Sequence, residues 1–230
     1  EAPVSGEDPG SSSIGDLLPQ TLLDSYGEYG GSDPEDDSGI LSYVSLRHGG
    51  EFSASAGGIP LILGGVGNGT VVDHVEVAAS EADGVRIFGG AVALNQMLVV
   101  HPGDDGLDID QGYTGVINEC VVLMGKNAFD EALEWDGPEG LGDDPGDFLL
   151  YLQQCSFVNK GPEQGRAALL KRAPAGYIQN CVWEGFEAWM AIGVNYDPDS
   201  GCAPVPDAYD HILANPPLLQ ITGNDFVSST

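Results

Sequence analysis

The feature of this sequence that most restricts its fold is a set of short β-type runs that recur and align with one another. Five runs place Val75, Met97, Cys120, Cys155 and Cys181 at the same position of the pattern. These positions follow one another at steps of 22, 23, 35 and 26 residues. Such intervals, rich in glycine, leave little room for an amphipathic crossover helix between strands, which argues against an α/β fold. A repeat of this length instead predicts one coil of a solenoid per interval.

A second series of runs alternates with the first and supplies Ile62, Ile87, Ile109 and Trp135 at matching positions. If successive coils stack at the strand spacing of ~4.8 Å, both series become inward columns that form the core. We therefore predict an all-β fold, a right-handed single-stranded parallel β-helix, over residues 39–194. The irregular segments 1–38 and 195–230 are expected to cap its two ends, with a short helix at 14–23 in the first of them.

The charge balance excludes one class of partner. The 36 acidic residues against 7 basic ones give a formal net charge of −29, which repels a nucleic acid backbone. The longest apolar run, residues 59–66, is too short to span a bilayer, so we predict no membrane insertion. An acidic surface suits a saline habitat or abundant divalent cations, because ions screen the repulsion between carboxylates. We therefore expect a halophilic protein.

The cysteines do not have the spacing of a zinc site. The repeat assigns three of them to the core as small apolar residues and leaves Cys202 without a predicted role.

Several stretches within residues 38–194 resemble one known group of proteins. They include Arg47-His48-Gly49-Gly50, Leu63-Gly64-Gly65 and the run from Gly103 to Asp110. The sequence resembles secreted bacterial β-helix proteins related to the pectate-lyase-like superfamily, most of which have no assigned activity. The resemblance implies a secreted or cell-surface location. It also implies further coils before residue 47, so we expect the solenoid end at residues 39–50 to pair with a second copy or with another surface protein.

The acidic residues of the repeat form the strongest candidate site. Alignment of the coils places Asp83, Asp105 and Asp130 at one turn, and stacks acidic pairs on an outward strand face. Carboxylates this close repel unless a cation lies between them, and calcium prefers oxygen ligands. A hydrated acidic face that salt alone screens is the alternative. Arg86 is expected to compensate the charge of Asp108 one coil away. The candidate metal ligands are Asp83, Asp105, Asp108, Asp110, Glu134 and Asp136.

Two functional hypotheses follow. The first is a non-catalytic extracellular protein, a rigid acidic element that self-associates end to end and is stabilised by calcium. The second is a protein that binds or degrades polysaccharide, with the acids as catalytic or calcium-binding groups. Against catalysis, the sequence lacks the Gly-His-Gly and Arg-Ile-Lys stretches of polygalacturonases and the arginine-rich strand of pectate lyases. Trp183, Phe186 and Trp189 are candidates for stacking on sugar rings, or alternatively for packing in the core.

Overall fold

The computed structural model describes residues 12–13, 28–49, 59–125, 130–138, 145–161, 165–192 and 208–228. Short strands dominate this part of the chain, joined by tight turns, and no helix within it is long and apolar enough to cross a membrane. The strands are β1 (Ser12–Ser13), β2 (Glu28–Tyr29), β3 (Ile40–Arg47), β4 (Leu61–Gly64), β5 (Val71–Ala78), β6 (Val85–Phe88), β7 (Ala93–Asn95), β8 (Leu98–Val100), β9 (Leu107–Asp110), β10 (Val116–Asn118), β11 (Val121–Met124), β12 (Leu133–Asp136), β13 (Leu149–Gln153), β14 (Ser156–Asn159), β15 (Arg166–Lys171), β16 (Ala175–Gln179), β17 (Val182–Glu184), β18 (Ala188–Ile192), β19 (Leu219–Thr222) and β20 (Asp225–Val227), with the 3-10 helix η2 (Pro145–Asp147) and the helix α2 (Ala208–Leu213).

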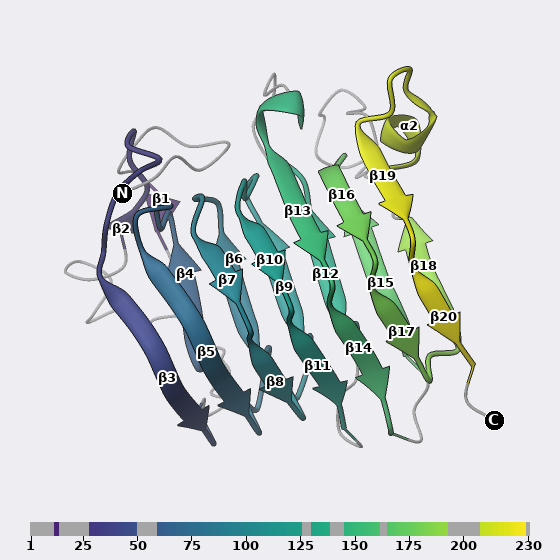
Figure 1. The fold of residues 1–230 in the computed structure, drawn as a ribbon, viewed down its shortest axis with the longest axis horizontal. Coiled ribbons are helices and arrows are strands. Elements are labelled where there is room, and N and C mark those ends of the chain that lie inside the picture. Colours follow the sequence, from purple (N-terminus) through teal and green to yellow (C-terminus); the bar gives the residue numbers. More distant parts are fainter. Residues whose placement is uncertain are drawn as a thin grey trace.

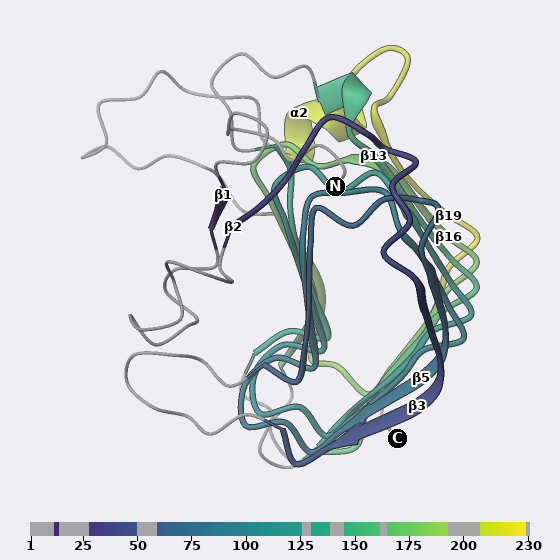
Figure 2. The same cartoon turned by 90° about the vertical axis from the view of Figure 1, so that its left-hand side faces the viewer.

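The strands stack as the coils of a parallel β-helix (Figure 1). One wall is a six-stranded parallel sheet in the order β18-β15-β12-β9-β6-β4. The long strand β5 pairs with β7 along its first half and with β8 along its second half, so two further walls diverge from it. Figure 2 looks along the stack, where successive coils overlie one another around a common core. The predicted all-β parallel β-helix is confirmed.

The corners between walls are built by residues in the left-handed backbone region. One column at the bend between the two diverging walls includes His74, Gln96, Glu119, Gln154 and Asn180, whose φ angles lie between 51° and 56°. Non-glycine residues adopt this region infrequently, and Asn is among those that tolerate it best. Because the same bend recurs in each coil, every strand keeps its place above the equivalent strand of the next coil.

The inward columns form the hydrophobic core as the repeat predicts. Val75, Met97, Cys120, Cys155 and Cys181 are each 1% exposed, and the pairing of β11 with β14 and of β14 with β17 stacks the three cysteines. On the six-stranded sheet, Ile87, Ile109 and Trp135 lie in register and are buried. The prediction that these residues face inward is confirmed.

The prediction for Ile62 is wrong by one residue. Ile62 pairs with Arg86, and the inward neighbour of Ile87 is Leu63. The sequence alignment superposed Gly64-Gly65 on the glycine pair that follows Phe88, but the left-handed corner residue of this coil is Gly65. Gly64 belongs to β4 for a different reason: a Cβ atom there would lie 2.8 Å from Cγ of the Tyr29 ring. The glycine therefore marks a close contact and not a turn.

The solenoid also extends further than predicted. Beyond residue 194, β19 pairs with β16 and β20 pairs with β17, which adds another pair of stacked strands. Pro216 and Pro217 lie between α2 and β19. The expected helix at 14–23 and Cys202 fall outside the described residues.

The strand β2 packs on the outer side of the six-stranded sheet through Tyr29. Tyr29 of β2 is buried, and its ring lies 5.7 Å from that of Phe88. Its hydroxyl donates a hydrogen bond to Gln111 Oε1 at 2.9 Å. Figure 2 shows β2 on this side. Tyr29 therefore covers part of this outer face at the C-terminal ends of β4, β6 and β9.

The register generates a stability test on two adjacent residues of β14. Phe157 is 0% exposed and stacks on Trp183 with ring centroids 4.1 Å apart, whereas its neighbour Val158 faces outward. We expect Phe157→Ala to lower the free energy of unfolding by about 3–5 kcal/mol, because a large buried ring is lost. Val158→Ala should lower it by less than about 1 kcal/mol. Urea denaturation of both variants measures this, and equal losses would contradict the register.

Candidate acidic site on the six-stranded sheet

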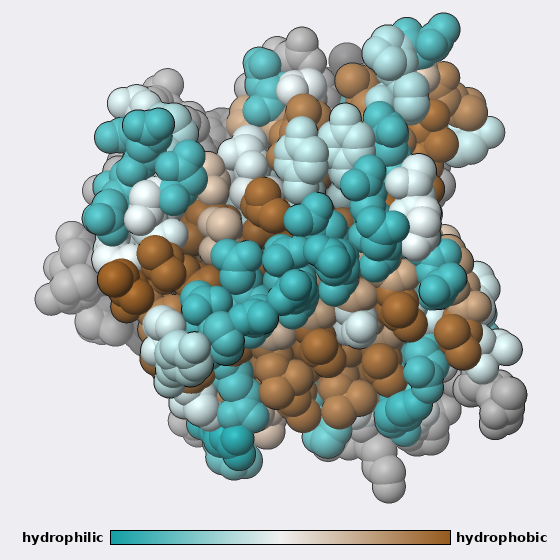
Figure 3. Space-filling model, in the orientation of Figure 1, coloured by the Kyte–Doolittle hydropathy of each residue, from teal (hydrophilic) through white to brown (hydrophobic). Residues whose placement is uncertain are grey.

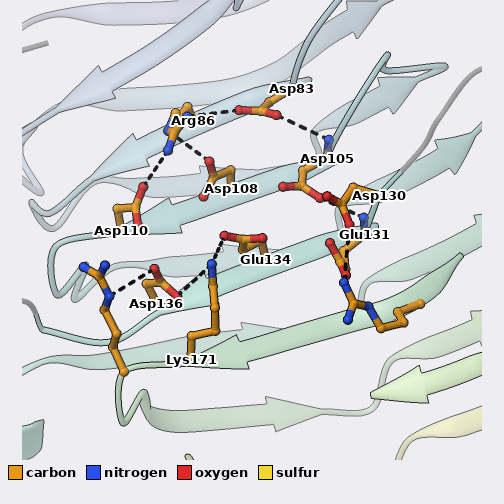
Figure 4. Close-up of polar contacts among 12 residues, drawn as sticks. Asp83, Arg86, Asp105, Asp108, Asp110, Asp130, Glu131, Glu134, Asp136 and Lys171 are labelled. Atoms are coloured by element: carbon orange, nitrogen blue, oxygen red, sulfur yellow. Dashed lines mark hydrogen bonds and ion pairs between the residues drawn. The ribbon is translucent and has the colours of Figure 1, made fainter. Parts of the chain in front are cut away.

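Acidic side chains gather on the outer face of the six-stranded sheet, over β9 and β12 and at the turns that lead into them (Figure 4). The cause is the alternation of each strand. Leu107 and Ile109 point into the core, so Asp108 and Asp110 point the other way. Glu134 and Asp136 do the same on the next coil. Unlike most outward carboxylates, the aspartates here are almost inaccessible, at 4% to 7% exposure.

The turn before these strands carries a ladder of three acids. Asp83, Asp105 and Glu131 are the equivalent residues of successive coils, because Val85, Leu107 and Leu133 are paired in register. The Asp105 N–H donates to Asp83 Oδ1 at 3.3 Å, and the Glu131 N–H donates to Asp105 Oδ1 at 2.8 Å. Asp83 and Asp105 thus each accept a backbone hydrogen bond from the next coil. The ladder is a product of the fold, and it holds the acids close together.

Basic residues compensate the two flanks of the cluster. Arg86 Nε lies 2.9 Å from Asp108 Oδ2, and Arg86 Nη2 lies 3.1 Å from Asp110 Oδ2. The charge compensation predicted for Arg86 is therefore present. On the other flank, Lys171 contacts Glu134 and lies 3.7 Å from Asp136 Oδ1.

Two more basic residues reach the cluster from β15 and the turn after it. Arg166 contacts Glu131, and Arg172 Nε lies 3.7 Å from Asp136 Oδ2. Asp105 lies between the two flanks and, among the residues that the structure describes, forms no ion pair with a basic side chain. The centre of the cluster is therefore its least compensated point.

Burial makes the charged form of these acids unfavourable. Burial, together with the neighbouring carboxylates of Glu134 and Asp83, raises the pKa of Asp105 to about 10. Burial also raises the pKa values of Asp83 and Asp108, although Arg86 opposes the rise at both. The pKa of Glu131 is raised for the same reason. At neutral pH the centre of the cluster therefore binds protons or another cation.

The geometry groups these acids into two overlapping sets of potential metal ligands. Carboxylate oxygens of Asp83, Asp105 and Asp108 lie within 4.8 Å of one another, and so do those of Asp105, Glu131 and Glu134. Asp108 Oδ1 is buried and, within the described chain, has no hydrogen-bond partner. Calcium takes about six to eight oxygen ligands, and carboxylates bind it through one or both oxygens. The donor set therefore fits a hard divalent cation.

The structure brings together only part of the predicted ligand set. Asp83, Asp105, Asp108 and Glu134 belong to the two groups, whereas Asp110 and Asp136 lie on the flanks beside Arg86 and Lys171. The predicted turn partner Asp130 is replaced by its neighbour Glu131.

Sequence reasoning also missed Arg166, Lys171 and Arg172. The position of Glu131 could have been predicted from the sequence, because the spacing that places Asp108 over Glu134 also places Asp105 over Glu131.

The aromatic candidates for sugar stacking have different surroundings. Trp183 is 0% exposed and Phe186 is 4% exposed, and both belong to the core. Neither ring is free to stack on a sugar, which matches the packing alternative. Trp189 is half-buried and meets the Phe226 ring edge-on, with centroids 5.3 Å apart.

Comparison with known proteins identifies one family. A family model described as pectate-lyase-like beta helix domain matches residues 22–209, which is more than half of the chain. No curated protein and no solved structure matches the chain significantly. The match covers every strand of the acidic site.

The raised pKa values predict how stability depends on pH when no divalent cation is present. The unfolded chain loses the Asp105 proton near pH 4, whereas the folded chain keeps it until about pH 10. Between these values the folded state binds more protons, so its stability falls as pH rises. One such carboxyl lowers the free energy of unfolding by about 1.4 kcal/mol per pH unit. Urea denaturation in chelator at pH 5, 7 and 9 measures this slope.

A single substitution tests the assignment of that slope. Asp105→Asn keeps the oxygen that accepts the Glu131 N–H but has no proton to lose, so we expect a shallower slope and higher stability than the parent at pH 8 in chelator. The matched control is Asp225→Asn, at an exposed strand position far from the cluster. If both variants keep the parental slope, Asp105 does not titrate as described.

Proposed function

This chain belongs to the pectate-lyase-like beta helix domain family, and from that premise we propose that it is a non-catalytic extracellular β-helix element whose acidic cluster binds a divalent cation, calcium first. The observation that carries the proposal is the group formed by Asp83, Asp105 and Asp108, whose buried carboxylate oxygens lie within 4.8 Å of one another. A cation at this point would replace protons that the buried acids otherwise bind. It would also cross-link adjacent coils.

The accessibility of the cluster favours an ion over a polymer. The side chains of Asp83 and Asp108 are 6% and 5% exposed, so a small ion fits this environment better than a chain of sugar rings. The basic side chains nearest to the acids, Arg86 and Lys171, are themselves engaged by carboxylates. A base for β-elimination or a pair of free acids for hydrolysis would first have to break these ion pairs. These contacts support a structural role.

An extracellular or cell-surface location agrees with the proposed ion. Calcium sites of extracellular modules bind with dissociation constants on the order of 10⁻⁴ to 10⁻³ M, which suits an environment rich in calcium. The net charge of −29 adds a general attraction for cations at the surface.

End-to-end association is the second part of the proposal. Among the described residues, β3 pairs only with β5 and β20 pairs only with β17, so a strand edge is open at each end. Ile40 is 78% exposed at one end and Phe226 is 43% exposed at the other. Continuing the parallel stack with a second copy would satisfy both edges. Such head-to-tail contacts do not close on themselves, so they give open-ended oligomers.

Polysaccharide binding is a second candidate function that one observation favours. Tyr151 and Tyr177 stack on the outer face of β13 and β16 with ring centroids 4.9 Å apart, and Tyr151 is 40% exposed. Exposed aromatic rings of this kind can pack on sugar rings. Incubation with acidic polysaccharides, with calcium or with chelator, tests both binding and cleavage, and calcium-dependent cleavage would contradict the non-catalytic proposal.

The cation proposal predicts a specific stabilisation. A ligand that binds only the folded state adds about 2.7 kcal/mol at a hundredfold excess over its dissociation constant. We expect calcium to raise the melting temperature more than sodium chloride of equal ionic strength does. Binding should also release at least one proton per ion near pH 7, because Asp105 must deprotonate to coordinate. Calorimetry in buffers of different ionisation enthalpy measures that release.

Variants of the acidic cluster distinguish specific calcium binding from general screening of the carboxylates by salt. Asp105→Asn should lose most of the specific calcium effect and the proton release, while Asp225→Asn should keep both. Equal stabilisation by calcium and by matched sodium chloride would mean that the cluster is only screened, and the cation site would be rejected.

For the open ends, Ile40→Lys or Phe226→Lys should suppress an oligomer ladder in sedimentation velocity, since a charge would be buried in the contact. A parent protein that shows no species beyond a dimer at any concentration would rule out end-to-end association.

A further inference from the structure

An apolar strip covers the outer face of the wall formed by β5, β8, β11, β14 and β17. Two outward columns run side by side along the stack. Leu98 and Val121, in the first column, are 37% and 40% exposed. The second column consists of half-buried apolar residues, namely Ala78, Val100, Leu123 and Val158. Figure 3 shows this hydrophobic area below a diagonal hydrophilic band. Contiguous apolar area of this kind marks an interaction surface.

The strip ends in an ion pair on each side. At the N-terminal end, Arg47 Nη2 lies 2.6 Å from Glu76 Oε2. At the C-terminal end, Lys160 contacts Glu184. The second column continues beyond its apolar residues at both ends. Arg47 pairs with Ala78 at one end, and Glu184 pairs with Val158 at the other. Arg47 and Glu184 therefore lie in the same outward column. The strip is therefore apolar in the middle, with one cation and one carboxylate at either end.

We infer that this strip is a lateral docking surface for a second copy of the same chain, related by a two-fold axis parallel to the strands between β8 and β11. That rotation reverses the stacking direction and lays Leu98 on Val121 of the second copy. It also brings Arg47 toward Glu184 of the second copy. The end of the strip that carries Glu76 then lies over the end of the second copy's strip that carries Lys160. The apolar middle meets its equivalent, and the charges at the ends are complementary. The two sheets would pack ~10 Å apart, as in other face-to-face sheet pairs.

The charge distribution selects a second copy over other occupants. The chain carries a net charge of −29, yet no acidic residue occupies the middle of the strip, so two copies can meet there without opposing carboxylates. A basic protein would be attracted instead to the acidic surface elsewhere. An anionic membrane would be repelled by the net charge, and the middle of the strip offers it no lysine or arginine. A two-fold contact of this kind closes, so it produces dimers.

Sedimentation velocity over a range of protein concentrations, in moderate salt that screens the net charge, tests the surface. The test uses the Ile40→Lys variant, which lacks the proposed end-to-end contact, and we expect this variant to show a monomer–dimer equilibrium. Val121→Lys should raise the dimer dissociation constant by about tenfold or more, because it places two charges in the centre of the contact. The matched control is Val71→Lys, an equally exposed outward valine of β5, at 43%, that lies on the other side of the corner at His74. The control should leave the equilibrium unchanged.

A charge exchange separates the contact from any loss of folding. Arg47→Glu alone should weaken the dimer, because it would oppose Glu184 of the second copy. Arg47→Glu combined with Glu184→Arg should restore it, although both intrachain ion pairs are then broken.

The inference would be overturned if the Ile40→Lys protein stays monomeric at all concentrations, if Val121→Lys and Val71→Lys have equal effects in it, or if the charge exchange does not restore the dimer. Association that persists unchanged when Val121→Lys is added to Ile40→Lys would also overturn it, because the contact would then use another surface.

Discussion

Every feature of this molecule depends on the parallel register in which each residue lies above its equivalent one coil away. At inward positions this register stacks apolar side chains such as Ile87, Ile109 and Trp135, and their burial stabilises the coils only as a set. At outward positions the same register stacks equivalent side chains on one another, whether they are apolar or charged. Because Leu107 must lie over Leu133, Asp105 has to lie over Glu131. The core that holds the fold together therefore imposes the acidic ladder.

Stacked and buried carboxylates have three physical ways to lower their energy. Some pair with a basic side chain, as Asp108 and Asp110 do with Arg86. Others accept backbone hydrogen bonds, as Asp83 and Asp105 do. The remaining charge must be taken up by a proton or by a cation. Asp105 has no basic side chain paired with it among the described residues. Burial and the neighbouring carboxylates therefore raise its pKa to about 10. The proposed calcium site follows from this imbalance.

The walls of the solenoid differ in chemistry although they share one repeat. The six-stranded sheet presents acids, and the wall that contains β8 and β11 presents aliphatic side chains. The left-handed corner residues keep the two apart, because each bend fixes which residues of a coil face which side. One wall is thus suited to cations and the other to a protein surface. A rigid scaffold can carry both without any conformational change.

The sequence by itself determined the repeat, the inward columns and the pairing of Asp108 with Glu134, because periodic apolar residues report burial directly. It failed at Ile62, since Gly64 is required by the approaching Tyr29 ring and not by a turn. Only the tertiary structure brought Arg166, Lys171 and Arg172 to the acids. Coils of unequal length hide such contacts, because side chains distant in sequence become neighbours only once the coils are stacked.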